Sequence, residues 1–107
     1  MRVLFICSGN ICRSPMAEGY LRHRARTEGL AELEVDSAGT LGIRKAPASD
    51  EAIQAMAEIG IDISGHRSKG VKSKILDGTD LTVAMTHDHL DFLAARHPGG
   101  EDERLLL

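Results

Sequence analysis

Residues 1–15 read MRVLFICSGNICRSP, a short apolar run followed by a polar loop and then by Ser-Pro. The continuous apolar run Val3–Ile6 is typical of a parallel strand that is covered on both faces. Ser14 and Pro15 predict the start of a helix, because serine caps helices and proline fits the first helical turn. The loop Cys7–Arg13 is therefore expected to join the first strand to the first helix.

The rest of the chain repeats this alternation of strands and helices. Further strands are expected at 33–37 and 81–85, and the apolar residues 105–107 predict the opening of a fourth strand. Helices are expected at 16–28, 50–59, 71–76 and 88–96, with a polar connection at 61–69. Such an alternation predicts a small doubly wound α/β sheet, in which ligands bind beyond the carboxyl ends of the strands.

Apolar spacing also predicts which helix residues face the core. In the first long helix these are Met16, Ala17, Tyr20 and Leu21. In the helix at 50–59 they are Ile53 and Met56, together with Ala57 or Ile59.

Size and charge restrict the classes of function. A chain of 107 residues holds one hydrophobic core, so residues 1–107 are expected to form a single domain. The net charge of −3 gives no support to a general nucleic-acid surface. No apolar run approaches the roughly 20 residues of a membrane span, and the N-terminal run is too short for a signal peptide. We therefore expect a cytoplasmic protein without a membrane partner.

The loop after the first strand has the composition of an anion-binding turn. Its amides precede a helix N-terminus, where unpaired N–H groups and the helix dipole favour negative charge. Gly9 permits a backbone conformation that a side chain would forbid, and Asn10 tolerates a positive φ. Together these residues let the loop amides curl into a nest for an anion.

Three side chains in and beside this loop suggest nucleophilic chemistry. Amides, the helix dipole and Arg13 would favour the thiolate form of Cys7, which is the reactive form of cysteine. Ser14 can donate a hydrogen bond to the same sulfur, and the planar guanidinium of Arg13 matches two oxygens of a phosphate. The expected reaction is covalent: Cys7 attacks phosphorus, and water later releases the phosphate.

The string Cys7–Pro15 resembles the signature loop of the low-molecular-weight protein-tyrosine phosphatases, in a bacterial form close to the protein-arginine phosphatases. The resemblance continues through Met16-Ala17-Glu18 and the segments 36–40, 62–68 and 80–85. It implies a four-stranded parallel sheet flanked by helices, with the phosphate loop between the first strand and the first helix. It also implies hydrolysis of phosphate monoesters on phosphorylated proteins, with no metal and no cofactor.

The resemblance assigns roles by matching position. Cys7 is the nucleophile, Arg13 the phosphate clamp and Ser14 the support of the thiolate. The residues implied to bind phosphate or another oxyanion are Ser8, Gly9, Asn10, Ile11, Cys12 and Arg13. The residues implied to hold the shape of the loop are Asn10, Ser37 and His66.

The sequence departs from the family at its general acid. The family uses an aspartate, usually followed by proline, on a loop well after the fourth strand. Residues 1–107 contain no Asp-Pro pair and end before that loop, so we expect the C-terminal part of the domain to be missing. Because a general acid typically contributes about 10²–10⁴-fold, we expect phosphate binding but impaired turnover.

Two positions bear on the substrate. Arginine phosphatases of this family carry threonine where this loop has Ile11, and a branched side chain there should crowd a guanidinium and favour phosphotyrosine. The aromatic residue often found on the substrate wall is replaced by Ile43, with Leu41 nearby, which weakens the argument for stacking an aryl ring. Residues 84–87 resemble both groups equally, so phosphoarginine remains the alternative substrate.

Other classes of function remain as hypotheses. A non-catalytic oxyanion-binding module would explain a missing acid but has no use for a thiolate. Arsenate reductase chemistry needs further cysteines, and none follows Cys12. Cys12 is expected either to form a reversible disulfide with Cys7 or to pack under the loop as a small residue.

Two polar clusters are expected to be solvated surface. His87 and His89 are two residues apart at a helix start, which points them in different directions and disfavours a metal site. Arg22, His23, Arg24 and Arg26 are expected to form a solvated basic face rather than a nucleic-acid patch.

Overall fold

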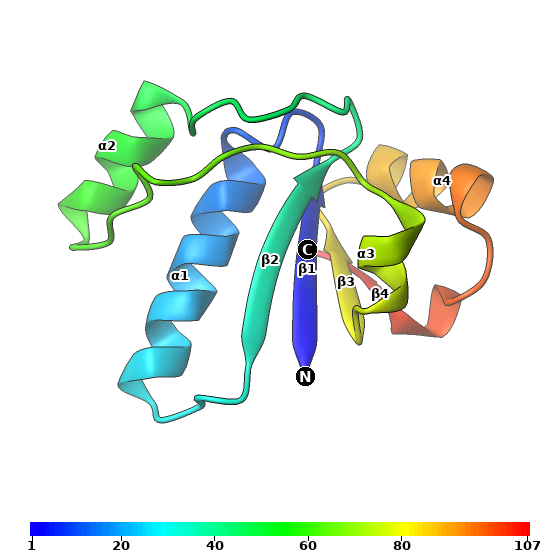
Figure 1. The fold of residues 1–107 in the computed structure, drawn as a ribbon, viewed down its shortest axis with the longest axis horizontal. Coiled ribbons are helices and arrows are strands. Elements are labelled where there is room, and N and C mark those ends of the chain that lie inside the picture. The colour runs from blue at the N-terminus through cyan, green and yellow to red at the C-terminus, as the bar shows by residue number, and fades with distance from the viewer.

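Four parallel strands form the centre of the molecule. The computed structural model describes all residues, 1–107. The strands are β1 (Arg2–Cys7), β2 (Glu34–Gly39), β3 (Leu81–Ala84) and β4 (Arg104–Leu106), and they lie in the order β2-β1-β3-β4 (Figure 1). The helices are α1 (Arg13–Thr27), α2 (Asp50–Glu58), α3 (Ser73–Asp77) and α4 (His87–Arg96), and a 3-10 turn spans Glu101–Glu103. The predicted four-stranded parallel sheet is confirmed.

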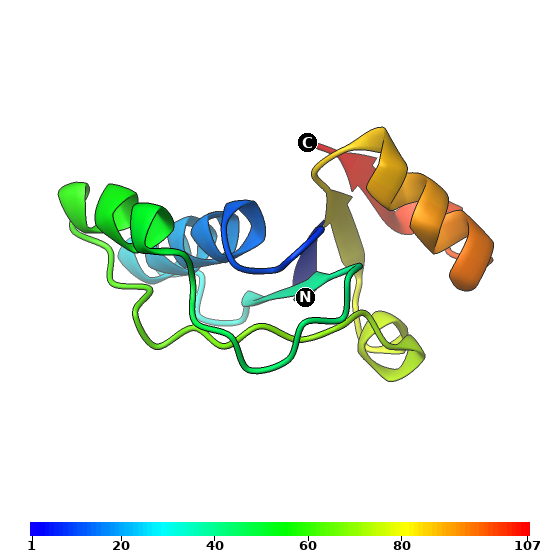
Figure 2. The same ribbon diagram turned by 90° about the horizontal axis from the view of Figure 1, so that it is seen from above.

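Helices cover both faces of this sheet (Figure 2). Side chains that alternate along the strands divide the core, as the pleat requires. On one face Val3, Phe5, Val35 and Val83 pack with residues of α1, and on the other Leu4, Ile6 and Ala38 pack with residues of α3 and its flanks. Helix α2 does not lie on the sheet but packs against α1. None of the helices combines the length and the apolar character needed to cross a membrane.

The strand order places a topological switch point beside β1. The chain leaves β1 through α1 toward β2 on one side, and it returns through α3 to β3 on the other side. Loops that follow two such strands separate at their carboxyl ends and leave space for a ligand. Cys7 is the last residue of β1, so the loop that follows it lies at this point.

Three sequence predictions about α1 and α2 are wrong. Helix α1 begins one residue before Ser14, with Cys12 as its N-cap, so Ser14 does not cap the helix. Tyr20 is 47% exposed, because Met16 packs toward α2 while Ala17 and Leu21 pack on the sheet, and Tyr20 lies outside both contacts. Ala57 and Ile59 are also exposed. Their predicted place in the core of α2 is taken by Ala52.

Candidate active site

The loop between β1 and α1 has the features of an anion-binding turn. Asn10 adopts a left-handed conformation, with a φ of 58°, and is completely buried. The backbone amides of Ser8, Gly9, Ile11 and Cys12 donate no hydrogen bond to another backbone group. Free amides in a loop of this shape are the donors that an anion needs. The positive φ expected to be tolerated at Asn10 is confirmed, whereas Gly9 is not in the left-handed region.

Cys7 lies at the start of this loop and is 3% exposed. Its Sγ accepts a hydrogen bond from the Asn10 amide at 3.2 Å and lies 2.9 Å from Ser14 Oγ. The Arg13 side chain begins α1 on the exposed side of the loop and forms no ion pair or hydrogen bond within the chain. The sulfur therefore lies between two hydrogen-bonding groups, and the guanidinium of Arg13 is free to bind a ligand.

The side chain of Asn10 fixes the direction of the hydrogen bond between Ser14 and Cys7. The backbone N–H of Lys69 donates to Asn10 Oδ1 at 3.0 Å, so Asn10 Nδ2 is the end that meets the two serines. That amide nitrogen donates to Ser14 Oγ at 2.8 Å and to Ser37 Oγ at 2.9 Å. Since Ser14 accepts from Asn10, its own hydroxyl hydrogen is available for Cys7 Sγ.

A buried carboxylate ends this network on its other side. Ser37 Oγ donates to Glu18, whose second oxygen pairs with Arg22. His66 Nε2 lies 2.7 Å from the backbone oxygen of Asn10, and its Nδ1 lies 3.9 Å from Glu18 Oε1. The structure thus places Asn10, Ser37 and His66 together, and Glu18 contacts two of the three.

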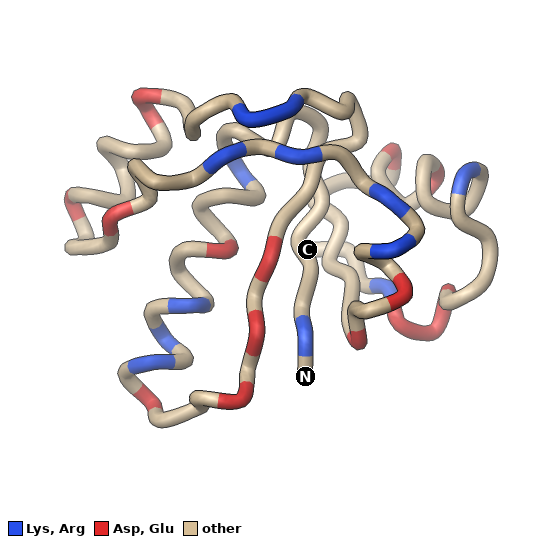
Figure 3. The backbone as a smooth tube through the Cα atoms, in the orientation of Figure 1, with Lys and Arg blue, Asp and Glu red and all other residues tan.

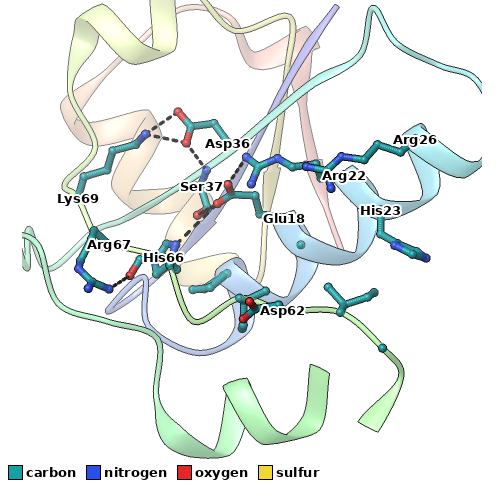
Figure 4. Close-up of a pocket in the computed structure, with 16 residues that line it drawn as sticks. Glu18, Arg22, His23, Arg26, Asp36, Ser37, Asp62, His66, Arg67 and Lys69 are labelled. Carbon is teal, nitrogen blue, oxygen red and sulfur yellow. Dashed lines mark hydrogen bonds and ion pairs between the residues drawn. The ribbon is translucent and has the colours of Figure 1, made fainter. Parts of the chain in front are cut away.

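A polar groove of about 470 Å³ lies behind the phosphate loop (Figure 4). Its floor includes Glu18, Ser37 and His66, and α1 and the segment after α2 form its walls. Neither Cys7 nor Arg13 lines it, so this groove exposes the supporting network rather than the reactive sulfur. All four residues of the basic cluster on α1 are exposed, as predicted, and Arg22 in addition pairs with Glu18 and so belongs to this network.

Close backbone contact between β2 and the loop requires a glycine at position 39. A Cβ atom built on Gly39 would lie 2.7 Å from Ser8 O and 2.9 Å from Asn10 N. Neither atom can move without opening the loop. The glycine that ends β2 therefore lets the loop pack directly on the edge of that strand.

His89 joins the loop from the opposite side, and the prediction that it is solvated surface is wrong. It is 3% exposed, and its Nε2 lies 2.9 Å from Ser8 Oγ. Its Nδ1 accepts from the Thr86 amide at 3.1 Å, so Nε2 carries the proton and donates to Ser8. Burial and the positive charge of Arg13 lower the pKa of His89, which favours this neutral form.

Sequence reasoning missed Glu18, Lys69 and His89 as members of the site. Glu18 and His89 are polar residues on helix faces, where exposure is the usual state. The signal for His89 was the capping box with Thr86, which draws the imidazole back toward the β3–α4 turn. Of the two alternatives for Cys12, packing under the loop is wrong, because Cys12 is exposed.

Known proteins that are similar to this chain belong to one family. The family model of the low molecular weight phosphotyrosine protein phosphatases matches residues 2–105. A probable low molecular weight protein-tyrosine-phosphatase, EpsP of Ralstonia solanacearum, is 38% identical over 90% of this chain and 63% of its own length. The chain thus spans a little under two thirds of that relative.

Solved structures resemble this one closely. The low molecular weight protein tyrosine phosphatase from T. tengcongensis superimposes with a TM-score of 0.92 at 43% identity, over 97% of this chain and 71% of its own. A YwlE arginine phosphatase, a C7S mutant with a phosphorylated active site serine, has a TM-score of 0.92 at 34% identity. The match covers 97% of this chain and 67% of that one. The match of the family model over nearly all residues, together with these relatives, shows that the chain belongs to the low-molecular-weight protein-tyrosine phosphatase family.

Proposed function

We propose that this chain takes phosphate from phosphorylated proteins through a covalent intermediate on Cys7. The observation that carries the proposal is the placement of one buried sulfur among an amide and a serine hydroxyl, next to four free loop amides and the free guanidinium of Arg13. A chain that only bound an oxyanion would need the amides and Arg13 but not a hydrogen-bonded sulfur. A related arginine phosphatase carries phosphate on the serine of a C7S mutant, which supports the same assignment.

The reaction would proceed in two displacements. The Cys7 thiolate attacks phosphorus, a sulfur–phosphorus bond forms, and the phosphorus–oxygen bond to the leaving group breaks. Water then attacks the cysteinyl phosphate, the sulfur–phosphorus bond breaks, and inorganic phosphate leaves. The loop amides and Arg13 would hold the three equatorial oxygens, and Ser14 would stabilise the sulfur when it becomes the leaving group.

The lining of the loop mouth supports phosphotyrosine as the substrate. A Cβ on Gly9 would lie 3.4 Å from Ile11 Cγ1 and 3.7 Å from Ile43 Cδ1, so two aliphatic side chains flank the glycine at the loop. Such a lining suits the apolar ring of an aryl ester better than a charged guanidinium. Phosphoarginine is the second candidate, because a related structure is an arginine phosphatase.

The two substrates can be separated at Ile11. We expect the wild-type chain to release phosphate from a phosphotyrosine peptide and not from a matched phosphoarginine peptide. An Ile11→Thr variant should gain activity on phosphoarginine, because the smaller side chain leaves room for the guanidinium. No gain in this variant would remove the argument from Ile11, and a wild type that prefers phosphoarginine would reverse the assignment.

The 107 residues contain no Asp-Pro pair to serve as the expected general acid. We therefore propose that the 107-residue chain releases one equivalent of p-nitrophenol from p-nitrophenyl phosphate in a burst. Steady-state hydrolysis of this substrate should then be slow. This leaving group needs little protonation, whereas general acid catalysis typically contributes about 10²–10⁴-fold for poorer ones. Mass spectrometry should find the phosphate on Cys7. Sustained rapid turnover of a phosphotyrosine peptide would contradict the impairment, and the absence of both burst and phosphoenzyme would contradict the mechanism.

A further inference from the structure

Positive charge is concentrated in two segments beside the phosphate loop. Residues 40–49 and 63–76 hold six of the thirteen Lys and Arg residues and none of the sixteen Asp and Glu residues. Figure 3 shows blue stretches along both segments where they cross the upper part of the molecule. We call this set the basic rim: Arg44, Lys45, Arg67, Lys69, Lys72 and Lys74. It stands out in a chain whose net charge is −3.

The two segments are joined to each other by hydrogen bonds around Ser68, which is 3% exposed. The Lys45 amide donates to Ser68 O at 2.8 Å, and the Ser68 amide donates to Ala46 O at 2.8 Å. Ser68 Oγ also donates to Ile43 O at 2.8 Å and accepts from the Ala46 amide at 2.9 Å. The rim is therefore built on a paired backbone and not on two independent loops.

Both segments are also bonded to the phosphate loop. From 63–76, the Lys69 amide donates to Asn10 Oδ1 at 3.0 Å. At the two ends of 40–49, the Leu41 amide donates to Ser8 O at 2.9 Å and the Ser49 amide donates to Ile11 O at 2.7 Å. Arg44 and Lys45 lie in the middle of this arch, next to Ile43, whose side chain lies beside Gly9. The rim is thus held at the edge of the loop that would receive the phosphoryl group.

Most of the rim charge is not neutralised within the chain. The Lys69 amine pairs with Asp36 at 2.6 Å, and the Arg67 guanidinium donates only to backbone oxygens. Arg44, Lys45, Lys72 and Lys74 are exposed and form no ion pair. Like charges kept together without partners create a field that attracts an opposite charge.

The backbone is strained at Lys45, which lies in the middle of segment 40–49. Its φ is 59°, a left-handed conformation that glycine adopts freely and that lysine rarely does. Glycine in this position would satisfy the turn without strain. Strained backbone of this kind is concentrated at functional sites, so the strain at Lys45 supports a functional role for this exposed, charged residue.

We propose that the basic rim binds acidic residues flanking the phosphorylated residue of a protein substrate. This inference rests on the proposed phosphatase function and narrows its substrates to phosphorylated sites in acidic segments. Arg44 lies three residues after Leu41, whose amide donates to Ser8 O. Because an extended chain advances about 3.3 Å per residue, acidic side chains within a few positions of the phosphorylated residue can approach Arg44 and Lys45. Neither rim segment contains Phe, Tyr or Trp, the usual side chains on which bases stack, which favours a polypeptide over a single-stranded nucleic acid.

The test measures binding of three phosphotyrosine peptides to the Cys7→Ala chain, which has no nucleophile at position 7 and leaves the peptides intact. The peptides carry Glu, Gln or Lys at the two positions on each side of the phosphotyrosine. We expect the Glu peptide to bind about tenfold more tightly than the Lys peptide, because each exposed charge pair contributes a few-fold at most. The difference should shrink as salt rises from 20 to 500 mM, because ions screen exposed charges.

Charge reversal locates the effect. In the Arg44→Glu/Lys45→Glu variant the preference should disappear or invert, while the Gln peptide changes by less than about threefold. The matched control, Arg24→Glu/Arg26→Glu, makes the same charge change on α1 and should keep the preference. If both variants lose it equally, the net charge of the chain is responsible and the rim is not a site.

Failure of this inference differs from failure of the phosphatase function. If inorganic phosphate and all three peptides fail to bind, the proposed function is wrong. If inorganic phosphate binds and the three peptides bind with the same affinity as one another, the proposed function stands and the rim proposal is wrong. If a single-stranded oligonucleotide competes with the Glu peptide at lower concentration than an unphosphorylated acidic peptide does, the rim prefers nucleic acid and the proposal is overturned.

Discussion

The phosphate loop and the segment 40–49 lie side by side at the carboxyl ends of β1 and β2, but their side chains have opposite surroundings. In the phosphate loop, Asn10 is completely buried and all its polar side-chain atoms are hydrogen-bonded. In the neighbouring segment, Leu41 is 69% exposed, and the side chains of Arg44 and Lys45 are exposed and form no ion pair. The side chains of the phosphate loop are therefore held by hydrogen bonds within the chain, whereas those of segment 40–49 are available to a partner.

The largest effect is expected where the buried region meets the ligand, at Arg13. Arg13→Lys should slow the burst of p-nitrophenol by about 10²–10³-fold, because a point charge replaces a planar donor that matches two phosphate oxygens. The free energy of unfolding should stay within about 0.5 kcal/mol of wild type, since the side chain of Arg13 forms no hydrogen bond or ion pair within the chain. Stopped-flow absorbance and urea denaturation measure the two quantities. Arg26→Lys is the control, and an equal loss there would mean that charge position is unimportant.

The next effect tests whether the loop depends on its internal hydrogen bonds. Asn10→Ala should lower the free energy of unfolding by about 2–4 kcal/mol, because it leaves buried partners unsatisfied and places alanine at a positive φ. Asn10→Gly removes the same hydrogen bonds without the conformational strain, so it should recover about 1–2 kcal/mol. Urea denaturation gives both values. Equal stability of the two variants would show that the left-handed conformation is not maintained by the loop.

A smaller effect is expected at His89, which supports the loop from the other side. Its pKa is lowered in the folded chain, so below about pH 6.5 the unfolded chain takes up a proton that the folded chain resists. The free energy of unfolding should therefore fall as the pH is lowered from 7.5 to 5.5, by at most about 1.4 kcal/mol per pH unit for this one group. His89→Asn should flatten that decline, and the exposed neighbour His87→Asn should not. An unchanged slope in His89→Asn would contradict the assignment of a neutral, buried imidazole.

The smallest effect is expected in the exposed segment. Leu41→Ser should change the free energy of unfolding by no more than about 0.5 kcal/mol, because its side chain is mostly in water. Affinity for inorganic phosphate, measured by calorimetry, should remain within twofold of wild type. A large loss of stability or phosphate affinity would mean that this segment is part of the buried support, and the contrast between the two regions would fail.

The sequence allowed the fold to be predicted because the features that carry it are local. Apolar runs such as Val3–Ile6 mark strands, and Gly29, with a φ of 73°, follows the end of α1 as expected. The loop could be recognised because its residues are consecutive. Residue environments were harder to predict: the bond between Ser8 and His89 spans 81 positions, and no local pattern reports it.

The same limit explains the individual errors. Ser14 resembles a helix cap in sequence, yet Asn10 and Cys7 draw its hydroxyl away from the helix terminus. Tyr20 fits the apolar stripe of α1, but that stripe divides between the sheet and α2 and leaves the ring in solvent. In each case a contact from another part of the chain decides the outcome, and helical periodicity carries no information about it.

The two cysteines provide the most direct test of the central claim that Cys7 is the nucleophile of a phosphate site. Cys12 is exposed and Cys7 is buried, so access alone predicts that iodoacetate modifies Cys12 first. The account predicts the reverse at pH 7, with Cys7 carboxymethylated faster than Cys12 and protected by millimolar inorganic phosphate, as followed by peptide mass spectrometry. Preferential modification of Cys12, with Cys7 slow and indifferent to phosphate, would contradict it.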